Sequence, residues 1–72
     1  MDHKTFWIWD IDGDKCINAR AIEYFDIEDH GEKGYVLFAN MKGGSKAFMI
    51  DRKKEKGQLK AKIRSLLIYL GG

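Results

Sequence analysis

A single cysteine in a chain of 72 residues is the feature that most limits how this protein can fold. Domains of this size bury roughly 60% of the surface that the unfolded chain exposes, so many of them depend on disulfides or a structural metal. Cys16 has no partner for a disulfide, and one cysteine with two histidines cannot complete a four-ligand zinc site. We therefore expect one domain over residues 1–72, held by a hydrophobic core and without a cofactor.

Short apolar segments separated by glycine-containing turns fill the first two thirds of the chain. They are rich in aromatic and β-branched residues, which is typical of strands. The strands are predicted at residues 5–11, 16–18, 22–28, 35–41 and 46–50. Asp12-Gly13 favours a tight hairpin turn after the first strand, and Gly43-Gly44 a turn before the last. Strands joined by such short turns pair in an antiparallel manner.

The hydrophobic pattern changes its period in the last third of the chain. Five apolar residues recur there at the spacing of one helix face: Leu59, Ile63, Leu66, Leu67 and Leu70. Asp51 is a suitable N-cap and Gly71-Gly72 a suitable stop, so we expect a helix over residues 52–70. The alternative is a start only near residue 57, because Gly57 weakens the first turns. The predicted fold is α+β, with an antiparallel sheet of four to five strands packed against one C-terminal helix.

Two segments carry more apolar side chains than this fold needs. Phe6-Trp7-Ile8-Trp9 places large apolar groups on both faces of one strand, and residues 65–70 are apolar on nearly all sides of the helix. The simplest way to cover these surplus apolar side chains is a second copy of the chain, so we expect a homodimer. The predicted interface residues are Trp7, Trp9, Ile68 and Tyr69. The alternative is that strand twist and neighbouring side chains cover the surplus within one chain.

Acidic and basic residues are unevenly divided along the chain. Residues 1–32 carry three bases and nine acids, whereas residues 33–72 carry ten bases and two acids. The candidate acidic surface, which can engage a basic partner or imitate a phosphate backbone, comprises Asp10, Asp12, Asp14, Asp26, Glu28 and Asp29. The candidate nucleic-acid-binding residues are Lys42, Lys46, Arg52, Lys53, Lys54, Lys60 and Arg64. The alternative for both sets is that the two halves interleave and their charges cancel locally.

The turn with three aspartates at residues 10–14, which we call the acidic turn, and the residues after it resemble the calcium loop of EF-hand proteins over residues 10–18. Asp10, Asp12 and Asp14 stand where that loop places its first three oxygen ligands. The glycine and the bidentate glutamate that the loop also requires are replaced here by Lys15 and Ala21. We therefore predict a solvated hairpin turn and no metal site.

Groups suited to catalysis or to membrane insertion are few. His30 lies in a polar loop, and the neighbours of Cys16 include no base that would activate it as a nucleophile. The apolar run Leu66–Leu70 is far shorter than the roughly 20 residues of a membrane helix, and the N-terminus lacks a signal-peptide pattern. We expect a cytoplasmic protein with no enzymatic activity and no membrane association.

The order of these segments resembles a loose class of very small proteins from bacteria and their phages. In that class, stretches like residues 12–18 and 22–29 precede a hairpin and an amphipathic helix. The resemblance implies a curved sheet closed by the helix, and some such phage proteins bind and block host defence machinery. We therefore expect a non-enzymatic protein–protein interaction module, which the resemblance extends to a phage-encoded inhibitor of a host protein. The alternatives are sequence-nonspecific nucleic-acid binding through residues 42–64 and phosphate-backbone mimicry by the acidic surface.

Overall fold

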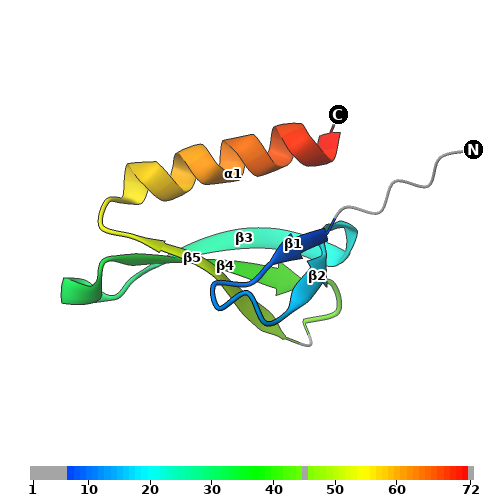
Figure 1. The fold of residues 1–72 in the computed structure, drawn as a ribbon, viewed down its shortest axis with the longest axis horizontal. Helices are drawn as coiled ribbons and strands as arrows, with labels where there is room; N and C mark the ends of the chain where they lie inside the picture. The colour runs from blue at the N-terminus through cyan, green and yellow to red at the C-terminus, as the bar shows by residue number, and fades with distance from the viewer. Residues whose placement is uncertain (1–6, 45, 72) are drawn as a thin grey trace, which may run out of the picture.

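A computed structural model of the protein describes residues 7–44 and 46–71 (Figure 1). The strands are β1 (Trp7–Trp9), β2 (Cys16–Asn18), β3 (Ile22–Asp29), β4 (Tyr35–Met41) and β5 (Ala47–Lys53). The helix is α1 (Lys56–Gly71), and two 3₁₀ turns, η1 (Ala19–Ala21) and η2 (Gly31–Lys33), precede β3 and β4. The predicted α+β class is confirmed: antiparallel strands come first, and one C-terminal helix packs against them.

The strands form two sheets. β1 and β2 make a hairpin, which we call the N-terminal hairpin, and β3, β4 and β5 make a three-stranded antiparallel sheet in that order. The two sheets are joined by a main-chain hydrogen bond of 2.8 Å, which Ile11 N, just past β1, donates to the Met49 carbonyl of β5. Figure 1 shows α1 running across one face of the three-stranded sheet, with the hairpin beside the C-terminal half of the helix.

One hydrophobic core lies where the two sheets and the helix meet. It contains Ile8, Ile17, Ala19, Leu37, Ala39, Ile50 and Leu59. Ile8 and Ile17 are directly opposite each other in the hairpin, so both turn their side chains inward. Leu59 fixes the first half of α1 and is fully buried, and a leucine buried in this way stabilises a fold by roughly 1.5–3 kcal/mol.

The first strand is shorter than the predicted range of residues 5–11. Thr5 and Phe6 lie outside the described residues, and β1 ends at Trp9 because Asp10 begins a turn. The Asp10 carboxylate, through Oδ1, accepts hydrogen bonds from Asp14 N at 3.0 Å and Lys15 N at 3.2 Å. This carboxylate holds the turn closed and prevents the strand from continuing.

The boundary between β5 and α1 also differs from the prediction. β5 extends to Lys53 instead of ending at residue 50, and the helix begins at Lys56, close to the later of the two predicted starts and not at residue 52. Asp51 is therefore not an N-cap: it lies within β5, opposite Leu37. The reason is tertiary, since β4 offers pairing partners as far as Tyr35, which lies opposite Lys53. β3 likewise continues one position past the prediction, to Asp29.

Candidate protein-binding site

Several large apolar side chains remain at least half exposed among the described residues. They are Trp7, Trp9, Tyr24, Leu67, Ile68 and Tyr69. Single exposed apolar residues are ordinary on protein surfaces, whereas contiguous ones mark interaction sites. Their positions on the strands and the helix therefore decide which of them form a site.

Trp7 and Trp9 lie on the outer side of the N-terminal hairpin. Successive side chains of β1 point to opposite faces, so Ile8 points into the core while Trp7 and Trp9 are 50% and 60% exposed on the opposite side. Cys16, which is exposed, stands directly opposite Trp9 in β2. The sequence predicted this outward pair because apolar residues follow one another without a polar alternation.

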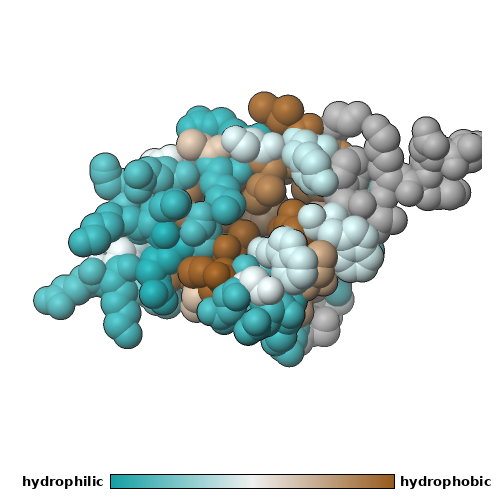
Figure 2. All heavy atoms as spheres, in the orientation of Figure 1, coloured by the Kyte–Doolittle hydropathy of each residue, from teal (hydrophilic) through white to brown (hydrophobic). Residues whose placement is uncertain are grey.

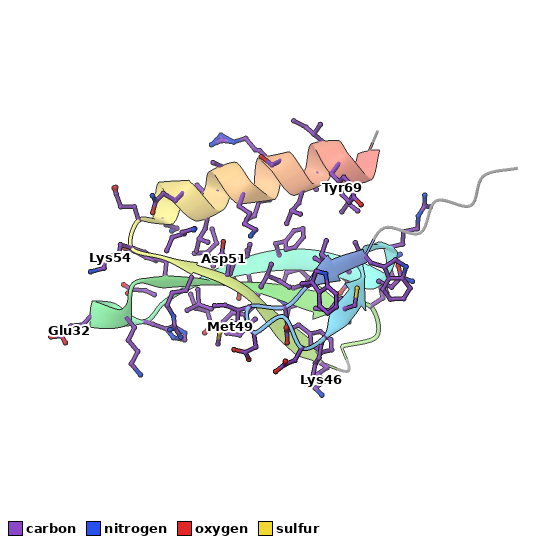
Figure 3. The ribbon with its side chains drawn as sticks, in the orientation of Figure 1. Glu32, Lys46, Met49, Asp51, Lys54 and Tyr69 are labelled. Carbon is purple, nitrogen blue, oxygen red and sulfur yellow. The ribbon has the colours of Figure 1, made fainter. Side chains whose placement is uncertain are left out.

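Tyr69 lies on the flank of α1 that faces this hairpin. It follows Leu66 by three positions and Lys62 by seven, which places all three on one stripe of the helix. Figure 3 shows Tyr69 pointing from the end of α1 toward the hairpin. We call Trp7, Trp9 and Tyr69 the aromatic face. Ile68 does not join it, because it follows the buried Leu59 by nine positions and so points roughly 180° away, where it is 76% exposed.

A cleft of about 400 Å³ separates α1 from the hairpin and β5 beside the aromatic face. Its lining has apolar residues, Ile8, Trp9, Ile11, Ile50 and Leu66, and polar ones, Asp10, Asp51 and Lys62. Figure 2 shows this hollow between the helix and the strands, with hydrophobic atoms around it and hydrophilic ones at the far end of the molecule. The cleft can accept an apolar side chain that is followed by a polar group.

Asp51 and Lys62 join the sheet to the helix at this cleft. Lys62 Nζ donates to Asp51 Oδ2 at 3.0 Å, and Arg52 N donates to Asp51 Oδ1 at 2.7 Å. Partial burial raises the pKa of Asp51, but these hydrogen bonds and the charges of Lys62 and Lys53 outweigh it, so the pKa lies below its ordinary value of 3.8. The Asp51 carboxylate is therefore charged at neutral pH. The sequence did not reveal it, because Asp51 and Lys62 belong to different elements.

The six predicted acidic residues lie in two groups at opposite edges of the three-stranded sheet. Asp10, Asp12 and Asp14 belong to the hairpin turn beside β5, and the remaining three, Asp26, Glu28 and Asp29, belong to β3. β4 lies between the two groups, so they do not form one surface. Within residues 7–44 and 46–71, no group of three or more histidine, cysteine, aspartate or glutamate residues is placed to hold a metal ion.

The predicted basic residues are also spread over the molecule. Lys42 and Lys46 flank the β4–β5 turn, whereas Lys53 and Lys54 lie at the other end of β5. Figure 3 shows Lys46 and Lys54 at opposite ends of that strand, which at about 3.3 Å per residue is more than 20 Å long. Arg52 is exposed near Lys53, and Lys60 and Arg64 are exposed on α1. The structure therefore divides these bases between the two ends of β5 and the helix.

Tyr24 and Leu67 form a second exposed pair that the sequence did not single out as a site. Leu67 lies on the other flank of α1 and Tyr24 on β3. Both line a groove of about 320 Å³ that runs between the helix and β3. A β-bulge between Ile22 and Tyr24 shifts the alternation of this strand, so its outward side cannot be read from spacing alone.

By its fold the chain is a small α+β domain with antiparallel sheets. No protein-family model matches the sequence, and no curated protein or solved structure matches it. In the part of the chain that the structure describes, no helix is long and apolar enough to cross a membrane.

Proposed function

We propose that this protein is a non-enzymatic protein–protein interaction module that forms a homodimer through its aromatic face. The observation that carries the proposal is the exposure of Trp7 and Trp9 on one side of β1, beside a cleft that α1 lines with Lys62 and Leu66, on the helix stripe that Tyr69 continues. Tryptophan and tyrosine supply a large share of the binding energy at protein interfaces. The exposed aromatic rings on β1 and on the flank of α1 that faces it are therefore the surface that gains most from association.

The size of the aromatic face sets the expected strength of the dimer. Covering the exposed half of each ring buries about 100 Å², so the three rings of each chain give about 600 Å² for two chains. Standard stable interfaces bury about 1,200–2,000 Å² in total, so neighbouring residues must supply the remainder. We therefore expect a dimer that dissociates in the micromolar range. A twofold contact is the natural form, because each copy then meets the same face of the other.

Sedimentation equilibrium over a range of protein concentrations tests this proposal. We expect the wild type to dimerise, and Trp7→Ser/Trp9→Ser to remain monomeric with its circular dichroism spectrum unchanged. Ile68→Ser is the matched control, because it removes an even more exposed apolar side chain that points away from the aromatic face. Monomeric wild type throughout the range, or equal loss of dimer in both variants, would refute the homodimer.

Cys16 provides an independent local measurement. It is the only cysteine of the chain, and it is exposed opposite Trp9. A dimer contact over the aromatic face shields this thiol, so its rate of reaction with a disulfide reagent should fall as protein concentration rises. An unchanged rate in a dimerising sample would place the interface elsewhere.

The resemblance to small phage proteins supports a host protein as a further partner of this module. The rival function is nucleic-acid binding, supported by the exposed bases Arg52, Lys53 and Lys54 at and just after the end of β5. Affinity for a labelled oligonucleotide that falls steeply with salt and is lost in Lys53→Glu/Lys54→Glu would favour this rival.

A further inference from the structure

We propose that β3 and the groove beside it bind an extended basic segment of a partner protein, which adds to the sheet as a further strand. This surface lies on the opposite flank of α1 from the aromatic face, and the inference does not depend on the homodimer. Three features of the described residues carry it: an edge strand, an apolar groove along that strand, and a set of carboxylates on it.

β3 is the edge strand of the three-stranded sheet. Among the described residues it pairs with β4 alone, over Ile22–Asp29. Its other side therefore presents main-chain donors and acceptors that an added strand can pair with. At eight residues it is longer than β5, the other edge strand, which has seven and already accepts a main-chain bond from Ile11, and longer than either hairpin strand, so it offers the most extended pairing surface.

The groove between β3 and α1 receives one face of such a strand. Its apolar lining includes Ile22 and Phe25 from β3 and Ile63, Leu67 and Leu70 from α1. Successive side chains of a strand point to opposite faces, so every second residue of an added strand would lie above this lining. Apolar residues are expected at those positions, because they would cover Leu67, which is 55% exposed.

The charges on β3 determine the other face of the partner. β3 carries four acidic residues and no basic one. Glu23 lines the groove, and Asp29 alternates onto the face of Phe25 and Ile27, so Asp26 and Glu28 are the acids of the other face. Asp26 and Glu28 pair with Phe38 and Val36, on the face that alternates with the one bearing Phe25 and Ile27. An added strand with lysine or arginine at its alternate positions would meet them. Two copies of β3 placed edge to edge would bring these acids together, so charge repulsion excludes a second copy as the occupant.

The bases on α1 sharpen this requirement. Lys60 and Arg64 are exposed on the outer part of the helix flank that bears Leu67. They disfavour basic residues on the helix side of the groove, whereas Asp26 and Glu28 favour them on the sheet side. The partner segment is therefore amphipathic, with apolar residues on the face that points toward α1 and basic residues on the opposite face.

The test uses the whole protein and a short peptide that alternates lysine with valine. Titration is followed by ¹⁵N–¹H correlation spectra, and we expect the amide signals of β3 to move most. A peptide methylated at alternate backbone nitrogens has the same charges but cannot pair as a strand, so it should not bind. A peptide alternating glutamate with valine should not bind either. Unmoved β3 signals, or equal binding of the methylated peptide, would overturn the proposal.

Two pairs of variants assign the contributions of charge and groove. Asp26→Lys/Glu28→Lys should weaken the peptide affinity by about tenfold, while Asp12→Lys/Asp14→Lys makes the same charge change in the hairpin turn and should leave it within about twofold. Leu67→Ala should weaken binding, whereas Ile68→Ala should not, because Ile68 does not line the groove. Equal effects within either pair would show non-specific attraction and refute the site. β3 signals that move with protein concentration alone would identify a second copy as the occupant and refute it as well.

Discussion

Replacing Asp51 with asparagine should weaken the attachment of α1 to the sheet in a manner that depends on pH. The substitution keeps the shape of the side chain and an oxygen that can accept from Arg52 N, which lies 2.7 Å from Asp51 Oδ1. It removes the negative charge that faces Lys62 Nζ at 3.0 Å. The change in unfolding free energy therefore reports mainly on the ion pair.

The exposure of the two side chains sets the magnitude. Hydrogen bonds to charged groups contribute about 1.5–3 kcal/mol when buried, and exposed ion pairs about 0.2–1 kcal/mol. Asp51 is 19% exposed and Lys62 39%, so the pair lies between these cases and solvent screens part of it. We expect a coupling of about 1 kcal/mol between Asp51→Asn and Lys62→Met at neutral pH. Lys53 adds little, because its Nζ is 3.9 Å away and its side chain is 46% exposed.

The pH dependence follows from the lowered pKa of Asp51. Folding favours the charged carboxylate, so its stabilisation is fully present above the ordinary value of 3.8 and is lost as pH falls through the lower folded-state pKa. Urea unfolding followed by circular dichroism, at neutral pH and at about pH 2.5, measures the effect on all four proteins of the cycle. A coupling near zero at neutral pH, or one that persists unchanged in acid, would refute this reasoning.

Two further predictions concern the turns. Gly34→Ala should destabilise the fold by about 1–3 kcal/mol, because φ is +89° and an added Cβ would stand 2.5 Å from the Lys53 carbonyl oxygen. Gly31→Ala is the control, since its added Cβ meets nothing within 4 Å and it should cost only about 1 kcal/mol, as measured by urea unfolding. Calcium should leave the midpoint of thermal unfolding unchanged, because the Asp10 carboxylate already accepts hydrogen bonds from the main-chain N–H groups of Asp14 and Lys15. A rise in the midpoint with calcium but not with magnesium would contradict this.

Much of the site could be predicted from local patterns, and the remainder could not. Trp7 and Trp9 were identifiable because an apolar residue at every position of a strand must expose some of them, and Tyr69 because the helix end is apolar all round. Ile68 was grouped with them because spacing does not tell which side of such a helix meets the sheet. The contact between Leu59 and the core decides that rotation, and it turns Ile68 away.

The amino-acid sequence by itself determined the α+β class, the order of strands and helix, and an excess of exposed apolar side chains. These properties depend on periodicity and turn residues, which act over a few neighbouring positions. Only the tertiary structure decided that β5 runs through Asp51, that the acids divide between two sheet edges, and that grooves flank α1 on both sides. Such features depend on pairing between segments distant in the chain, whose energies outweigh local preference and leave no local signal.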